Sequence, residues 1–253
     1  MKFDLQKATI TKRLSAYILD LFIVILLAAG LMALIYDVVD YDSKANELQS
    51  YYNEYEDKYG IDTKLSNEDI AKLPQLEQDK YAQASKEFSE DERIRNVYSV
   101  LINLTIIITS ISLLIAYVIS DVVLPLILKN GQTVGKKVFN IALMRVDGVK
   151  VSTFQLFVRA VLGKFTIETM LPVLLVMMMF FGVMGGIALI VVLLLLVLQI
   201  VVMSISKTNS AMHDLLAVTV TVDLESQRIF ESEAALMEYK QRIAAEKAAE
   251  APY

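Results

Sequence analysis

The chain has 253 residues and a formal net charge of −5, and 55% of its residues are hydrophobic, with a mean hydropathy of +0.50. This apolar share exceeds that of soluble domains, and it is concentrated in runs of about 20 residues, the length that a helix needs to cross a bilayer core of ~30 Å. Cysteine is absent, which excludes disulfides and cysteine ligands or nucleophiles, and His213 is the only histidine. The composition therefore predicts an integral membrane protein that is not an enzyme and has no metal site or other cofactor.

Four apolar segments predict four transmembrane helices, at about residues 16–35, 97–128, 165–181 and 187–205. The first is predicted to be an uncleaved anchor rather than a signal peptide, because its apolar run continues to Tyr36. Pro125 should distort the end of the second helix. Gly182, Gly185 and Gly186 predict a short turn between the third helix and the fourth.

The charges of the connecting segments predict the orientation in the membrane. Residues 1–15 carry four basic residues and one acid, and the connection 129–164 carries seven basic residues and one acid. The connection 37–96 instead carries 16 acids and 8 bases. Because lysine and arginine are concentrated in cytoplasmic connections, we expect a multi-pass protein of the cell membrane with both termini in the cytoplasm.

The connection 37–96 is predicted to form an extracytoplasmic helical hairpin. Its first half is rich in helix formers and ends at Gly60, and Ser66–Asp69 resembles a capping box with Asp in place of Glu. The charges of this hairpin are interpreted as solvated surface in preference to a binding site.

Three β-prone runs lie in the regions predicted to be cytoplasmic. Two of them flank Asp147-Gly148 within Asn140–Val151, a pattern typical of a type I′ hairpin, and the third is Ala217–Asp223. A small cytoplasmic sheet that joins these runs would bury them.

The predicted fold class is therefore membrane all-α, with four transmembrane helices, an extracytoplasmic helical hairpin and a small cytoplasmic β-sheet. Its segments in chain order are the N-terminus with the first span (1–36), the hairpin (37–96), the second span (97–128), a cytoplasmic loop with a β-hairpin (129–164), the third and fourth spans (165–206), a closing motif with a strand (207–223) and a charged cytoplasmic helical tail (224–253).

Arg13, Tyr17 and Asp20 share one face of the first predicted helix, at spacings i, i+4 and i+7. If the span begins near Ala16, Asp20 lies roughly 6–8 Å inside the hydrocarbon at 1.5 Å per residue. An ionised carboxylate there costs on the order of 2–3 kcal/mol, so Asp20 should face protein or water. Two interpretations stay open for Asp20: ion or proton binding, and an interhelical hydrogen bond that fixes packing.

Asp121 is the predicted mate of Asp20, because it lies at a similar depth in the second span, with Tyr117 one turn before it. Two carboxylates at one level of a bilayer tend to share a proton or bind a cation, which is the chemistry that a proton-coupled carrier needs. The alternative is that Asp121 is hydrated at a distorted helix end. Glu168 is a weaker candidate, because it can reach the membrane interface.

Several ordered motifs together resemble the RDD family of membrane proteins, which is named for one arginine and two aspartates. The start of the first helix resembles the family's first motif, GQTVGKKVFNIALMRVDG at Gly131–Gly148 resembles its loop, and SAMHDLLAVTVTV at Ser210–Val222 resembles its closing motif. The matching positions are Arg13, Asp20, Gly131, Gly135, Lys136, His213 and Asp214. The resemblance covers the four spans and the sheet, but neither the hairpin nor the tail.

The sequence departs from the family pattern at two places in the closing motif. Val218 stands where the family usually has glycine, and Ser210-Ala211 replaces the usual arginine. Asp214 is expected either to cap a short helix or to pair with Arg13.

The lysines at Lys136 and Lys137 are expected to meet anionic lipid headgroups.

The resemblance implies a bacterial inner-membrane protein, for which the family's suggested role is transport of ions or other ligands. One hypothesis is a small transporter that couples monovalent cations to protons, with Asp20 as the titrating ligand, acting as a homo-oligomer because four spans are few for a carrier. The other is a non-transporting scaffold that recruits a membrane-complex partner through residues 37–96 or the tail. The lipid bilayer is the expected environment, and no nucleic-acid partner is expected.

Overall fold

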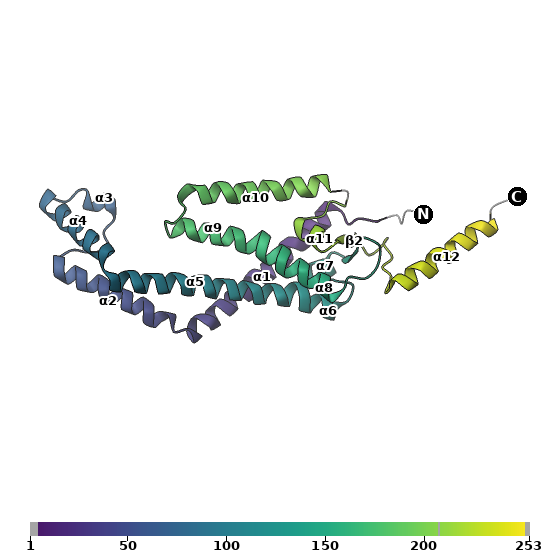
Figure 1. Cartoon of the computed structure of the whole chain (residues 1–253), viewed down its shortest axis with the longest axis horizontal. Coiled ribbons are helices and arrows are strands. Elements are labelled where there is room, and N and C mark those ends of the chain that lie inside the picture. The colour runs from purple at the N-terminus through teal and green to yellow at the C-terminus, as the bar shows by residue number, and fades with distance from the viewer. Residues whose placement is uncertain (1–4, 207, 251–253) are drawn as a thin grey trace. The chain divides into compact units, whose positions relative to one another are not determined.

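The structure, a computed structural model, describes residues 5–206 and 208–250. It is mostly helical, with four helices long and apolar enough to cross a membrane and a small two-stranded sheet (Figure 1). The chain divides into two compact units, which are described separately. One is Gly30–Ile111, called here the hairpin unit, and the other holds the remaining described residues and is called the sheet unit.

The first two spans are longer than predicted. The first is α1 (Ile10–Val38), and the second consists of α5 (Glu92–Val118), a π-helical turn η1 (Ile119–Val123) and α6 (Leu124–Leu128). Pro125 lies at the start of α6 and lacks the N–H that a regular helix would use, which accounts for the irregular turn before it. The distortion predicted for this end of the helix is therefore present.

The third span begins well before the predicted position. It consists of α8 (Thr153–Phe157), the π-helix η2 (Val158–Met170) and α9 (Leu171–Phe180), whereas the prediction placed its start near residue 165. A capping box at Ser152 and Gln155 fixes its first turn.

The fourth span, α10 (Gly185–Ile205), packs along α9 after the predicted glycine turn, in which Gly182 and Gly185 have positive φ (Figure 1).

The sheet pairs the loop between the second and third spans with the closing motif. Strand β1 (Ile141–Arg145) is antiparallel to β2 (Thr219–Asp223), so that two of the three predicted β-prone runs become strands. The run after Gly148 forms no strand in the described chain and contributes two isolated bridges, from Lys150 to Met144 and from Val149 to Phe230. The type I′ turn predicted at Asp147-Gly148 is wrong, because only Gly148 has positive φ, and type I′ requires it at both central residues.

Val218 precedes β2 in a left-handed conformation, with φ of 54°. A β-branched side chain is strained there, whereas glycine adopts such a φ freely. In the family that the sequence resembles, glycine is expected at this position, so valine here places strain in the turn that leads into β2.

The hairpin unit contains α2 (Tyr41–Tyr59), α3 (Asn67–Ile70) and α4 (Gln75–Glu90), and α2 packs against α4. Phe88 on α4 stacks on Tyr52, at 4.7 Å between ring centroids, and meets Tyr55 edge-on at 5.2 Å. The helices predicted for this region are thus present.

The caps of the short helices in this unit also follow the sequence. Gly60 ends α2 with φ of 64°. The Asp69 amide donates to the Ser66 hydroxyl oxygen, which confirms Ser66 as the N-cap of α3.

Candidate functional site

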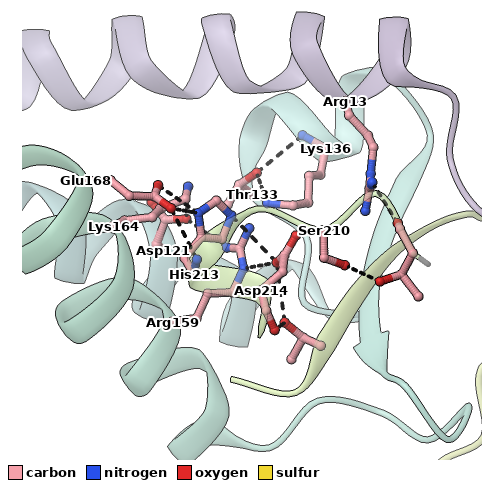
Figure 2. A network of polar contacts seen from close by, with 12 residues as sticks. Arg13, Asp121, Thr133, Lys136, Arg159, Lys164, Glu168, Ser210, His213 and Asp214 are labelled. Atoms are coloured by element: carbon pink, nitrogen blue, oxygen red, sulfur yellow. Dashed lines mark hydrogen bonds and ion pairs between the residues drawn. The ribbon is translucent and has the colours of Figure 1, made fainter. Parts of the chain in front are cut away.

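Ionisable side chains from five elements gather inside the sheet unit, and we call them the polar cluster. They are Arg13, Asp20, Asp121, Lys136, Arg159, Lys164, Glu168, His213 and Asp214. Figure 2 labels all of them except Asp20. With His213 neutral, the cluster has four cations (two Arg, two Lys) and four carboxylates (three Asp, one Glu), so that its charges balance. All but the half-buried Arg13 have little exposed surface.

Asp20 fastens the loop after the second span to α1. Its carboxylate accepts the Thr133 hydroxyl at 2.5 Å and the Gly135 amide at 2.7 Å, at the start of α7 (Val134–Val138). A Cβ at Gly135 would lie 2.2 Å from the carbonyl oxygen of Ala16, so α7 can approach α1 this closely only with glycine there. Asp20 therefore makes the packing bond that was one of its two interpretations.

Asp121 is held by two cations of the third span. Its Oδ1 accepts Lys164 at 2.5 Å and Arg159 at 3.3 Å, and Arg159 Nε also donates to Asp214 at 2.8 Å. Its other oxygen, Oδ2, is buried without a hydrogen-bond partner among the described residues. The expected pairing of Asp20 with Asp121 is wrong for this structure: no hydrogen bond joins them within the described chain, because each carboxylate is bound by other donors.

His213 lies on α11 (Met212–Leu216), between two carboxylates. Its Nδ1 is 2.8 Å from the Glu168 oxygens, and its Nε2 is 3.6 Å from Asp214 Oδ1, beyond hydrogen-bond reach. Burial, assisted by Arg159, lowers the pKa of His213. These distances fit a neutral ring whose Nδ1–H donates to Glu168 while the Nε2 lone pair faces Asp214.

Asp214 stays ionised despite its burial. Burial alone would raise the pKa of its carboxyl, but the charge of Arg159 outweighs that effect and holds the pKa well below its usual range. Asp214 is thereby a fixed negative charge next to the histidine ring.

The π-helix η2 sets the geometry of this group. Its hydrogen bonds join residues five apart, so that Arg159 and Lys164 lie one above the other. A Cβ at Gly163 would lie 2.4 Å from the His213 Cβ, so α11 packs against η2 at a residue without a side chain. Both cations belong to the connection 129–164, which the sequence predicts to be a cytoplasmic loop. Their five-residue spacing within the mainly apolar stretch 153–180 is the signal that could have identified them.

Lys136 is buried rather than at the membrane surface. It is 5% exposed, and its Nζ donates to Thr133 Oγ1 at 3.3 Å, whereas the neighbouring Lys137 is exposed. The lipid contact expected for Lys136 is therefore wrong, because its side chain turns into the polar cluster. Burial, together with the charges of Arg159 and Lys164, lowers the pKa of Lys136 to about 7.

Arg13 fixes the start of α1 to the segment before α11. It donates to the carbonyl oxygens of Asn209 at 2.6 Å and Thr208 at 3.2 Å. Arg13 and Asp214 do not form a direct ion pair, because Asp214 is bound by Arg159 instead. The main contact of Asp214 is therefore neither the helix cap nor the pair with Arg13 that the sequence suggests.

The other predicted site residues lie outside the polar cluster. The Tyr117 hydroxyl is 2.8 Å from that of Thr169, and Tyr17 is 41% exposed. Gly131 has φ of 61°, and a Cβ there would lie 2.8 Å from the Val151 side chain, which explains a glycine at this turn.

A comparison of the sequence with protein families matches residues 7–218 to the RDD family. The chain belongs to the RDD family. The matched range contains every residue of the polar cluster and all four apolar helices, so this RDD family protein is a membrane protein whose buried charges lie within the shared part of the chain. Comparisons with curated proteins and with solved structures return no match.

Proposed function

We propose that this RDD family protein exchanges a monovalent cation for a proton across the membrane, with the polar cluster as the coupling site. Ionisable side chains among membrane-spanning helices are costly and mark ion and proton pathways. Here, eight such side chains have little exposed surface, and five of them lie within the apolar spans, namely Asp20, Asp121, Arg159, Lys164 and Glu168. In this proposal, the polar cluster faces the cytoplasm and residues 37–96 lie on the outer side of the membrane.

The observation that carries the proposal is the imidazole of His213 between two carboxylates. Nδ1 is bonded to Glu168, and Nε2 faces Asp214 at 3.6 Å (Figure 2). A proton arriving at Nε2 would turn the neutral ring into a donor on both sides, and a proton leaving from Nδ1 would pass to Glu168. An imidazole between two acceptors can take up a proton at one nitrogen and release one from the other.

A small cavity offers water access to this pair. It is about 20 Å³ in volume, which is room for about one water molecule, and its polar lining comes from Glu168 and Gln199. Gln199 belongs to α10, a mainly apolar span. A water molecule there would connect the fourth span to the Glu168–His213 pair.

The charge balance of the polar cluster favours exchange over joint transport. Four cations and four carboxylates leave no net charge when His213 is neutral. Every added proton or cation makes a buried group positive, which is unfavourable in a low dielectric. A cation and a proton therefore compete for the same site.

Ion flux in proteoliposomes tests the proposal. Vesicles that contain a pH dye receive pulses of sodium, lithium or potassium, and wild type is compared with Glu168→Gln and with Glu92→Gln. Glu92 is the matched control, because its side chain is 82% exposed. We expect cation-driven proton movement in wild type and in the control, and its loss in Glu168→Gln. Equal flux in all three proteins would contradict the assignment of the polar cluster.

A scaffold that recruits a partner protein is the second candidate. The hairpin unit has a cavity of about 230 Å³ lined by aromatic side chains, among them Tyr52, Tyr81 and Phe88, which is large enough to take a partner's side chain. Replacing residues 41–90 with a short linker should abolish capture of a partner if the protein is a scaffold, and should leave cation-driven proton flux in place if it is a carrier.

A further inference from the structure

Lys136 is a buried cation whose charged head has only a neutral side chain as a partner, whereas the buried cations Arg159 and Lys164 each contact a carboxylate. Its single hydrogen bond goes to the Thr133 hydroxyl at 3.3 Å, and that oxygen is itself engaged with Asp20. Within the described residues, no carboxylate lies within ion-pair distance of Lys136 Nζ. A lysine that is 95% buried is thus left without a counter-ion in direct contact.

The charges around Lys136 come from three other elements. Asp20 on α1 and Asp121 in η1 attract its proton, whereas Arg159 and Lys164 on η2 repel it. Burial and the two cations outweigh the two carboxylates, and the pKa of the Lys136 amine is lowered to about 7. Lysine is known to change its protonation state in such surroundings, whereas arginine does not.

We propose that Lys136 carries the exchanged proton, and that loss of this proton prepares the polar cluster to hold one monovalent cation. The inference rests on the proposed exchange function and adds the residue and the stoichiometry. With Lys136 protonated, the four carboxylates are balanced by four cations. With Lys136 neutral, three cations remain, and the cluster has one uncompensated negative charge.

Asp121 supplies the oxygen that this state leaves without a partner. Its side chain is fully buried, and Oδ2 has no donor among the residues that the structure describes. The charge of Lys136 acts on Asp121, so the amine lies close enough for its neutralisation to be felt there. One proton released by Lys136 therefore corresponds to one cation gained, which excludes a divalent ion as the preferred substrate.

The test follows the amine directly, in wild-type protein in lipid nanodiscs. Lysine side chains labelled with ¹³C and ¹⁵N are titrated with sodium chloride present or with choline chloride in its place, and the Lys136 signal is assigned from its loss in Lys136→Arg. We expect Lys136 to lose its proton near neutral pH and at lower pH in sodium, while the exposed neighbour Lys137 stays protonated. A Lys136 signal that remains charged well into alkaline pH, or that titrates identically in both salts, overturns the inference.

Two variants connect this titration to transport. Lys136→Arg keeps the positive charge permanently, so we expect it to fold and to lose cation-driven proton flux. Lys136→Gln removes the charge, so we expect it to bind sodium without releasing a proton.

Wild-type flux in Lys136→Arg would also overturn the inference. A wild-type protein whose Lys136 titrates with sodium but which shows no flux would contradict the transport proposal alone, and flux without such a titration would contradict the Lys136 assignment alone.

Discussion

The sheet unit and the hairpin unit hold ion pairs of nearly equal length in opposite surroundings. Arg159 and Asp214 are 2.8 Å apart, with side chains 4% and 5% exposed, and Lys58 and Glu87 are 2.6 Å apart, at 53% and 39%. Solvent screens the second pair, which therefore contributes little to stability, whereas in the first pair each buried charge would be left uncompensated without the other. The distance between the charged atoms therefore does not show whether an ion pair stabilises the fold; the burial of the two side chains does.

The largest expected effect comes from breaking the buried pair. Arg159→Met leaves the carboxylates of Asp121 and Asp214 short of a partner, and we expect a loss of about 3–5 kcal/mol in the free energy of unfolding. Thermal unfolding in detergent, followed by circular dichroism, measures it. Lys58→Gln in the hairpin unit is the control, and its melting temperature should match wild type. Equal effects of the two substitutions would remove the distinction between the units.

The two units also differ in how closely other atoms approach their glycines. Gly135→Ala would place a Cβ 2.2 Å from the Ala16 carbonyl oxygen, whereas a Cβ at Gly30, where the hairpin unit begins, would meet nothing within 4 Å. We expect Gly135→Ala to destabilise the protein by about 1–3 kcal/mol through overpacking. Gly30→Ala, in the interior of α1, should be neutral or slightly stabilising. The same unfolding assay compares them, and a harmless Gly135→Ala would contradict the close approach of α7 to α1.

The role of Asp20 as a fastener can be measured as a coupling energy. If the carboxylate acts through Thr133, Asp20→Asn and Thr133→Val should each destabilise the protein and should be strongly non-additive when combined. A charge-assisted hydrogen bond predicts a coupling of about 1.5–3 kcal/mol in a double-mutant cycle. Additive effects would instead favour an independent role for Asp20 as the titrating ligand, in which case Asp20→Asn should lose flux while Thr133→Val keeps it.

A smaller effect on the free energy of unfolding is expected at a strained backbone position in the sheet unit. Val218 has φ of 54° and is 56% exposed, so little packing is lost on substitution. We expect Val218→Gly to raise the free energy of unfolding by about 1 kcal/mol through relief of this strain. The matched exposed valine Val146, which is 49% exposed and has no positive φ, should lose stability when replaced by glycine.

The smallest effect is a pH dependence that arises from His213. Its pKa is lowered from 6.5 in the folded state, so the unfolded chain binds more protons as the pH falls through 6.5. Stability should therefore decrease as the pH falls through 6.5 towards the folded-state value. The melting temperature of His213→Gln should decline less over this range than that of wild type. Parallel curves would show that the ring is protonated equally in both states.

The local pattern of the sequence predicts the spans and strands well, because apolar length and alternation are local properties. The helix α10 and the strand β2 lie close to their predicted positions. The burial of Asp20 could also be predicted, since a carboxylate inside an apolar run has few alternatives. Its partners could not, because Thr133 lies 113 residues away and is brought to Asp20 only by tertiary packing.

Two buried cations of the polar cluster, Arg159 and Lys164, could not be predicted from the sequence. The sequence predicts that Arg159 and Lys164 lie in a cytoplasmic loop, because basic residues beside a span usually lie at the interface. In the structure, they are 3% and 5% exposed, because Asp121 and Asp214 neutralise them inside the helix bundle. A charge that is buried by its counter-ion cannot be distinguished from a surface charge until the counter-ion's place is known.

The central claim, that a cation and a proton compete within the polar cluster, can be tested on the purified protein without transport. Wild-type protein in weakly buffered detergent receives sodium chloride, with choline chloride as the control, and the pH is recorded. We expect sodium to release up to one proton per chain near neutral pH, and we expect no release from Lys136→Arg. An unchanged pH on adding sodium, lithium or potassium to wild type would contradict it.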